Sequence, residues 1–279
     1  MASIILPSRW TSQPQYPVEI DTSNPFCRGI IGAWAGNTLY DSSGRGQFLL
    51  GHVNYKPTEK GTGYAYPSTS STVQPAYLAD SANLDLPVSH TVFTLARVES
   101  TADQVLVAKG QNGLEYASWG LGVGTLDSSI SSVGKLVYRV RTSNSATALE
   151  AKTSGNVETG RVLAIAGWHD GSNVKLFVDG VESGSATGSG SAPFVGTSRL
   201  YIGGDNNAGF SGGRWFVTGA IPLVILFNRA LSDGEIKALS ANPWQIFRPQ
   251  RRVMYFDVGA GGGITVAVNQ STETDTAQA

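Results

Sequence analysis

The sequence of 279 residues contains little charge and almost no cysteine. Charged residues make up 15% of it, against roughly 25% in typical globular domains, and the net charge at pH 7 is -1. Such a chain offers no electrostatic attraction to nucleic acid or to an anionic membrane. Cys27 is the single cysteine, which excludes an internal disulfide and a zinc site built on cysteines.

Long apolar runs are also missing. The apolar run near the N-terminus, Ile4–Leu6, is three residues long and follows no basic start, so it is not typical of a secretory signal. No stretch approaches the ~20 apolar residues that cross a bilayer. We therefore expect no membrane insertion.

Glycine is abundant, with 34 residues, and short strand-like segments recur between glycine-rich turns. Many short strands with such turns predict an all-β sandwich or jelly roll. The segments are 29–35, 62–66, 90–98, 104–109, 118–123, 135–142, 161–168, 173–178, 198–203 and 215–227.

The alternation of the segment at 173–178 predicts which of its residues are buried. Val174, Leu176 and Val178 share one face, and Lys175 and Phe177 share the other. A period of two with one apolar face indicates a half-buried antiparallel strand. We therefore expect the three aliphatic side chains in the core and the other face in solvent.

Two local signals mark the ends of elements. Asp179-Gly180 has the residue types that a type I′ hairpin turn requires. Ser232 and Glu235 form a capping-box pattern, and Pro243 ends the apolar stripe that follows them. These patterns predict a β-hairpin and one short C-terminal helix.

Both ends of the chain differ from the middle, which divides the sequence into three parts. Residues 1–28 are rich in proline, serine and glutamine and predict an extended arm, whose backbone hydrogen bonds we expect to go to partners. Residues 29–247 form the expected jelly-roll domain. Residues 248–279 form a tail or the start of an assembly segment.

Four segments, in order, resemble the laminin-G-like branch of the concanavalin A-like lectin/glucanase superfamily. They are RGIIGAWAGNTLYDSSGRG (28–46), LAIAGWHDGSNVKLFVDGVESG (163–184), LYIGGD (200–205) and GAIPLVILFNRALSDGEIKAL (219–239). The resemblance covers roughly residues 28–240 and implies an antiparallel jelly-roll sandwich of the lectin type. The flanks at 6–34 and 241–256 resemble those of such domains in tailed-bacteriophage structural proteins, which implies a virion protein made in the host cytoplasm.

Catalysis finds little support in the sequence. Glycosidases of this superfamily carry Glu-x-Asp-x-Glu on one strand, whereas Glu19 and Asp21 lack the third carboxylate and lie in the proline-rich arm. The histidines, His52, His90 and His169, show no catalytic or metal-binding spacing. His169 follows Trp168 at a strand end, where we expect an exposed imidazole.

Calcium has one candidate loop, at 203–213. The resemblance implies a calcium ion at the sandwich rim, and Asp205 with its neighbouring asparagines offers the oxygen ligands that calcium prefers. Asp41 is a second metal candidate. The alternative is that these residues only suit turns.

The same loop is also the candidate sugar site. Aromatic faces bind sugars together with planar polar groups, and we expect Phe210 to be exposed. Trp119, Trp168 and Trp215 lie near strand ends and are either sugar platforms or core, whereas Trp34 is assigned to the core. The predicted ligand-binding residues are Asp205, Asn206, Asn207, Phe210, Arg214 and Trp168.

These observations favour a non-enzymatic virion protein, in head decoration or in a tail or fibre, that displays a carbohydrate-binding domain. Two alternatives stay open: a purely structural cementing or spacer module, and a glycan-cleaving enzyme. The expected partners are other virion proteins bound through the arm and tail, further copies of the chain in a homo-oligomer, and a cell-surface glycan.

Overall fold

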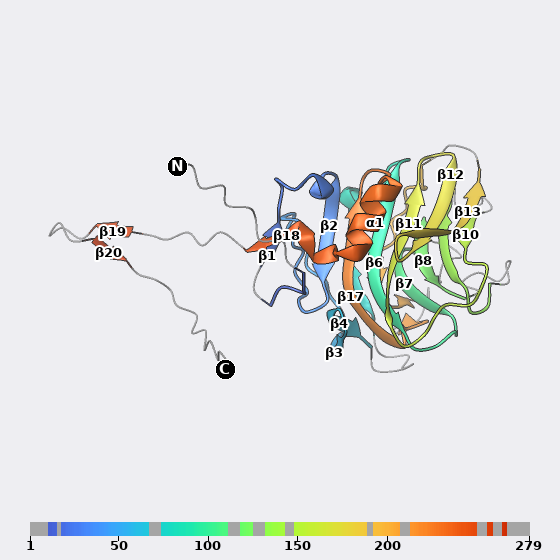
Figure 1. Cartoon of the computed structure of the whole chain (residues 1–279), viewed down its shortest axis with the longest axis horizontal. Coiled ribbons are helices and arrows are strands. Elements are labelled where there is room, and N and C mark those ends of the chain that lie inside the picture. The colour runs from blue at the N-terminus through green and yellow to red at the C-terminus, as the bar shows by residue number, and fades with distance from the viewer. Residues whose placement is uncertain are drawn as a thin grey trace.

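The computed structural model describes two facing antiparallel sheets with a covering layer on one of them (Figure 1). It describes residues 11–15, 18–66, 74–110, 118–124, 132–142, 148–188, 192–206, 213–249, 256–258 and 264–266. This architecture confirms the predicted all-β sandwich.

The larger sheet has eight strands in the order β13-β12-β11-β6-β17-β4-β3, with β2 paired to β17 outside this path. The predicted bounds of β6 and β12 are confirmed, because both segments have strong β-forming residues between clear turns. The strands are β2 (Ile30–Ala35), β3 (Asn54–Thr58), β4 (Gly61–Ala65), β6 (His90–Val98), β11 (Val162–His169), β12 (Asn173–Val178), β13 (Val181–Thr187) and β17 (Gly219–Phe227).

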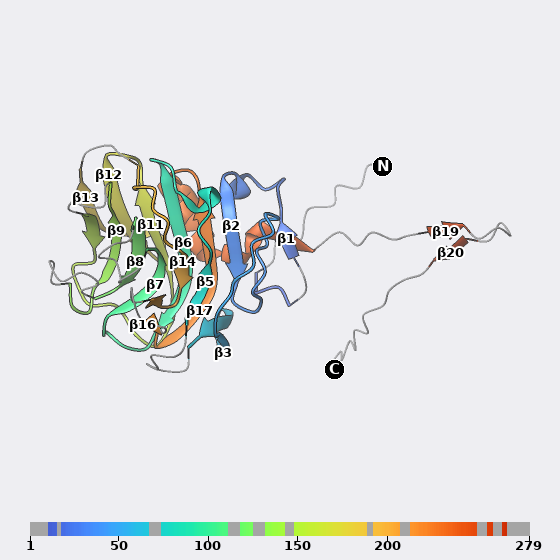
Figure 2. The ribbon, with the colours of Figure 1, turned by 180° about the vertical axis from the view of Figure 1, so that it is seen from behind.

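The smaller sheet has six strands in the order β10-β9-β8-β7-β14-β5 and faces the viewer in Figure 2. Its strands β5 and β10 were not predicted, because three or four residues are too few to show a period. The strands are β5 (Ala76–Leu78), β7 (Gln104–Lys109), β8 (Trp119–Val123), β9 (Leu136–Val140), β10 (Leu149–Lys152) and β14 (Leu200–Ile202).

The main core lies between the two sheets. Trp34 and Trp119 are 0% and 1% exposed there, which confirms the core assignment of Trp34 and assigns Trp119 to the core as well. Val174 and Leu176 of β12 are also buried in this core, as their alternation predicts, whereas Val178 is only partly buried.

A second core covers the outer face of the eight-stranded sheet. Phe177 is 1% exposed and packs in this cluster, so the prediction that its face of β12 is in solvent is wrong. The same cluster explains why β17 shows no alternation: every one of its residues is buried, because both faces of the sheet are covered. The covering layer contains α1 (Asp233–Ala241) and the short 3₁₀ helix η3 (Pro243–Ile246).

Helix α1 begins as the sequence predicts. Ser232 Oγ accepts a hydrogen bond from the Glu235 backbone N–H, and the Glu235 carboxylate accepts one from the Ser232 backbone N–H. Arg229 donates two hydrogen bonds to the same carboxylate, and these lower the pKa of Glu235 to about 2. No helix in the described part of the chain is long and apolar enough to cross a membrane.

The segment expected as a free arm packs on the domain wherever it is described. Strand β1 (Val18–Ile20) pairs with β18 (Phe247–Pro249), and the Asp21 N–H donates to the Ile246 carbonyl at 2.8 Å. Ile20 is buried in the second core. These backbone bonds therefore go to the same chain rather than to partners, because the two flanks of the domain pair with each other as antiparallel strands.

The remaining elements are small. Strand β15 (Asp205–Asn206) pairs with β16 (Gly213–Arg214), and β19 (Phe256–Val258) pairs with β20 (Ile264–Val266). Two further 3₁₀ helices are η1 (Pro25–Cys27) and η2 (Ala82–Leu84). Asp179 and Gly180 have positive φ values of 50° and 81°, which confirms the predicted turn.

Candidate functional site

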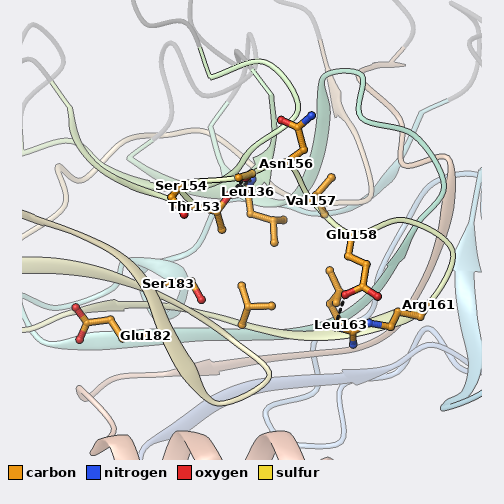
Figure 3. Close-up of a pocket in the computed structure, with 12 residues that line it drawn as sticks. Leu136, Thr153, Ser154, Asn156, Val157, Glu158, Arg161, Leu163, Glu182 and Ser183 are labelled. Atoms are coloured by element: carbon orange, nitrogen blue, oxygen red, sulfur yellow. Dashed lines mark hydrogen bonds and ion pairs between the residues drawn. The ribbon is translucent and has the colours of Figure 1, made fainter.

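A pocket of about 430 Å³ opens at one rim of the sandwich, where the edge strands β10 and β13 lie against each other (Figure 3). Both sheets contribute to it, together with the loop that links β10 to β11. We call it the rim pocket; its lining residues are Leu136, Thr153, Ser154, Gly155, Asn156, Val157, Glu158, Arg161, Leu163, Val178, Glu182 and Ser183.

The apolar part of the rim pocket lies at one end of the main core. Leu136 is the first residue of β9 and Leu163 is the second of β11, and both are 1% exposed. Val178, the last residue of β12, packs partly against the same core and lines the pocket. A ligand here therefore meets an aliphatic surface rather than aromatic rings.

The loop that carries the polar lining is held by hydrogen bonds to the start of β9. The Leu136 N–H donates to Thr153 Oγ1 at 3.2 Å, and the Thr153 hydroxyl donates to the Gly155 carbonyl at 2.7 Å. The Val157 N–H donates to the Gly134 carbonyl at 2.7 Å. These bonds fix the loop before a ligand arrives, which lowers the entropy lost on binding.

Charged residues stand at two places around the rim pocket. Arg161 makes ion pairs with Glu158 at 2.7 Å and with Asp179 at 2.8 Å, and Glu182 pairs with Lys175 at 2.8 Å. The hydrogen bond from Arg161 lowers the pKa of Glu158 and raises that of the guanidinium itself. Glu158 is therefore an ionised acceptor of hydrogen bonds at neutral pH.

The rim pocket combines neutral polar groups with this apolar floor. Ser154, Asn156 and Ser183 bring hydroxyl and amide groups that both donate and accept hydrogen bonds (Figure 3). A concave site with a few fixed polar groups on an apolar surface suits a small ligand that has hydroxyl groups and C–H faces.

The predicted loop site is only partly within the described residues. Asp205 is fully buried, and its strand β15 pairs with β16, which brings the backbones of Asp205 and Arg214 side by side. Asn206 belongs to the same two-residue strand. Asn207 and Phe210 lie outside the described residues, so their predicted roles stay predictions.

The tryptophans predicted near strand ends lie in different layers. Trp168 packs beside the second core, and its indole N–H donates to the Leu231 carbonyl at 2.8 Å, so the structure does not bring it to Asp205. Trp215 packs against Val105 and Ala108. Trp119 is in the main core. Trp215 is the tryptophan nearest in the chain to the predicted loop at 203–213.

The carboxylate of Asp41 is already engaged in a turn. Its oxygens accept hydrogen bonds from the N–H groups of Ala33 and Ser43 at 2.9 and 2.8 Å, and from the Ser43 hydroxyl at 2.6 Å. Within the described ranges, no three His, Cys, Asp or Glu side chains gather as a metal-binding group. Calcium at Asp41 or Asp205 stays a prediction.

The carboxylates weighed for catalysis have structural partners. Glu19 accepts a hydrogen bond from Arg248 at 2.8 Å, across the β1–β18 pair. Asp21 accepts two from Ser23, from its N–H at 3.1 Å and from its hydroxyl at 2.6 Å. Glu19 therefore holds the N-terminal segment on the domain, whereas the bonds of Asp21 close a local turn within that segment.

Two of the histidines are buried together. His169 is 0% exposed, so the prediction of an exposed imidazole is wrong; it is the last residue of β11 and lies opposite His90, with ring centroids 5.2 Å apart. The Tyr138 hydroxyl lies 2.6 Å from His90 Nε2, and the Pro87 carbonyl lies 2.7 Å from Nδ1. Burial lowers the pKa of His90 to about 3 and lowers that of His169.

A family model described as the concanavalin A-like lectin/glucanases superfamily matches residues 68–237, which is more than half of the chain. The chain belongs to this superfamily. The match confirms the predicted membership, and the fold is that of lectin-like carbohydrate-binding domains. No curated protein sequence matches the chain.

Solved structures share this superfamily fold at low sequence identity. Domain 4 of AbnA, an extracellular GH43 arabinanase from Geobacillus stearothermophilus solved with arabinotriose, is 17% identical with a TM-score of 0.55; the match covers 76% of this chain and 98% of that one. The binding domain of Paraclostridial Mosquitocidal Protein 1 is 13% identical with a TM-score of 0.56 and coverages of 76% and 52%.

A structure of botulinum neurotoxin type C, whose cell entry depends on two ganglioside molecules, is also 13% identical, with a TM-score of 0.56 and coverages of 76% and 50%. The chain therefore spans about half the length of the two toxin domains, and nearly all of the arabinanase domain.

The rim-pocket residues of this superfamily member were missed by sequence reasoning. Their loop, TSGNVETGR at 153–161, is polar and contains two glycines, which is typical of any surface turn. The signal that was available is the position of this loop directly before β11, because Leu163 near the start of β11 and Val178 at the end of the neighbouring strand β12 are aliphatic.

Proposed function

We propose that the chain is a non-enzymatic carbohydrate-binding protein and that the rim pocket is its sugar site. The observation that carries this proposal is the fixed polar loop over an aliphatic floor, at the rim of a lectin-like sandwich. A sugar of one or two units presents hydroxyl groups to Ser154, Asn156 and Ser183 and C–H groups to the floor. The sugars and gangliosides named with the structurally similar proteins support this ligand class.

The absence of catalysis is part of the proposal. Hydrolysis of a glycosidic bond needs one protonated carboxyl group as the acid and a second carboxylate beside it. Glu158 has a lowered pKa because of Arg161, so it does not supply the acid, and Glu182 is held by Lys175. These ion pairs support a site that holds a sugar without cleaving it.

We also propose a virion setting, in head decoration or in a tail or fibre. The flanks that resemble those of phage structural proteins support this setting, and in the structure they form the β1–β18 pair. We further propose that a calcium ion binds near Asp205, outside the rim pocket.

The test is glycan binding by the full chain and by two matched glycine variants. Gly155 lines the rim pocket and Gly234 lies in α1, and a Cβ atom at either meets nothing within 4 Å. We expect Gly155→Leu to weaken binding at least tenfold, because the side chain occupies the space of the sugar, and Gly234→Leu to leave it unchanged. Binding is measured on a glycan array and then by calorimetry, starting with arabinotriose.

Four results would reject parts of the proposal. Equal affinity of the Gly155→Leu variant and the wild type would remove the rim pocket as the site. A wild type that binds no glycan on the array would favour the cementing or spacer module. Release of reducing sugar by the wild type would show an enzyme, and an affinity unchanged by chelator would exclude the calcium ion.

A further inference from the structure

The six-stranded sheet continues past its edge strand β5 through two short segments, 39–41 and 47–50. The N–H groups of Leu50 and Tyr77 each donate to the carbonyl of the other, at 2.9 and 2.8 Å, which joins the segment 47–50 to β5. Tyr40 and Phe48 form the next antiparallel bridge. Three backbone segments therefore lie side by side at this edge of the sandwich.

The register of these segments decides which side chains face outward. Leu49 is 0% exposed and packs in the main core, so Phe48 and Leu50 on either side of it point away from the core. Tyr40 lies opposite Phe48, and Tyr77 lies opposite Leu50, which places them on the same outer face. Tyr40, Phe48 and Leu50 are 69%, 42% and 47% exposed.

The side chains on this face form a row that contains two close contacts. The rings of Tyr40 and Phe48 have centroids 5.0 Å apart and planes inclined by 60°. At the other end, the exposed guanidinium of Arg199 lies 4.4 Å from the ring centroid of Tyr77. We call the row of Tyr40, Phe48, Leu50, Tyr77 and Arg199 the aromatic band.

The aromatic band differs from the other exposed apolar side chains in the described part of the chain. Apart from Tyr55 on β3, those are isolated valines, at positions 88, 133, 181 and 195. Single exposed apolar residues are ordinary, whereas a contiguous exposed row marks a binding surface. The band is therefore a candidate binding surface, and its dimensions indicate which class of ligand fits it.

The dimensions of the band suit a glycan chain better than a protein. It is one or two residues wide on each segment and crosses from 39–41 to the start of β14, three strand spacings of about 4.8 Å, or about 14 Å in all. A stable protein interface uses 20–30 residues on each side. The exposed rings of Tyr40 and Phe48, with the Tyr40 hydroxyl at one end of the band and the Arg199 guanidinium at the other, offer both apolar contact and hydrogen bonding to a chain of several sugar units.

We propose that the aromatic band is a second carbohydrate-binding surface, which holds an extended oligosaccharide of three or more units across this edge of the six-stranded sheet. This proposal rests on the proposed function, because it assumes the same class of ligand. It differs from the rim-pocket proposal in the site and in the length of the sugar chain that is bound, because the rim pocket takes only one or two units. Affinity for the band should therefore rise with chain length, and affinity for the pocket should not.

The test compares the full chain with the variant Tyr40→Ala/Phe48→Ala and the control Tyr55→Ala. Tyr55 is 49% exposed, similar to the band residues, and stands on β3 away from the band. The probes are tri- and hexasaccharides of arabinose, of β-1,4-linked glucose and of β-1,4-linked N-acetylglucosamine, measured by calorimetry after an equal melting temperature is checked. We expect the double variant to lose about tenfold or more in affinity for a hexasaccharide, and the control to bind as the wild type does.

The outcomes separate the two proposals. Loss in the Tyr40→Ala/Phe48→Ala variant with full binding by Gly155→Leu supports the band and rejects the pocket. Loss in Gly155→Leu alone overturns the band and leaves the pocket. Wild-type binding that does not increase from tri- to hexasaccharide overturns the band, and so does a double variant whose only change is a smaller oligomer in solution. A wild type that binds none of the six probes overturns the band as well, whatever the array shows for the pocket.

Discussion

The outer face of the eight-stranded sheet and the β5 edge of the six-stranded sheet expose their aromatic residues to very different degrees. The outer face of the eight-stranded sheet is covered by α1, η3 and the β1–β18 pair, and its aromatic residues, such as Phe177, are buried. The six-stranded sheet ends at the β5 edge in rings that stay in solvent, such as Phe48. The same residue type thus stabilises the fold on one sheet and is available to a ligand on the other.

The comparison teaches that local alternation does not reveal which face is covered. Phe177 alternates with core residues, which predicts an outward-facing ring, whereas Phe48 belongs to the apolar run Phe48–Leu50, which predicts neither face. The difference comes from residues far along the chain, since Ile20 and Leu239 belong to the layer that covers the face of Phe177. Substitutions on the two faces should separate stability from binding.

The largest expected effect is that of a charge on the covered face. Phe177→Asp places an unpaired carboxylate in the second core, and we expect it to lower the free energy of unfolding by at least about 4 kcal/mol. Phe48→Asp should change it by less than about 0.5 kcal/mol, because the side chain is exposed. Urea denaturation of both variants measures the difference, and equal midpoints would show that the two faces are not distinct.

A smaller loss is expected from trimming the contact between the N-terminal segment and the domain. Ile20→Ala removes buried methyl groups from the second core and should cost about 3 kcal/mol, within the usual range of 2–5. Leu50→Ala, in the aromatic band, should have little effect on the midpoint. If Ile20→Ala unfolds at the wild-type urea concentration, the segment lies on the domain without stabilising it.

The smallest effect concerns pH. The pKa of His90 is about 3 in the folded protein and about 6.5 when unfolded, so below pH 6.5 the unfolded state binds the proton more strongly. His90 therefore contributes stability that is fully present above pH 6.5 and is lost as the pH falls toward 3, by up to about 1.4 kcal/mol per pH unit. His169 has a lowered pKa as well and acts in the same direction.

This dependence is measured by urea denaturation between pH 7 and pH 5, above the range where Glu235 titrates. His90→Gln should be less stable at pH 7 and should show a flatter slope with pH. His52→Gln, at an exposed position, should keep the wild-type slope. A wild-type free energy of unfolding that is constant from pH 7 to pH 5 would contradict the buried, neutral state of His90.

The sandwich itself could be predicted because its signals are local. Strand β6, the turn at Asp179-Gly180 and the capping box at Ser232 each depend on residue types within a few positions. Strand β3 was missed because Pro57 and its polar neighbours contradict a strand pattern, and it forms only by pairing with β4.

The candidate sites were harder to predict because they depend on distant contacts. The rim pocket needs Leu136 and Val178, which belong to different sheets, and the loop between them has an ordinary turn composition. The burial of His169 depends on its position opposite His90, 79 residues earlier in the chain, as the two residue numbers show. The predicted residues Asn207 and Phe210 lie outside the described part.

The pairing of β1 with β18 also sets how the domain responds to mechanical force. Val18 lies opposite Pro249, and the segment before it is held as well, because the Gln13 side chain hydrogen-bonds to Thr62 and to the Pro222 carbonyl of the eight-stranded sheet. A load along the N-terminal flank therefore acts first on the bonds of Gln13 and then on the ladder, from Val18 toward Ile20. If the chain is held at both ends, these side-chain bonds and the short pair would yield first, and the tether would lengthen while the rest of the sandwich stays folded.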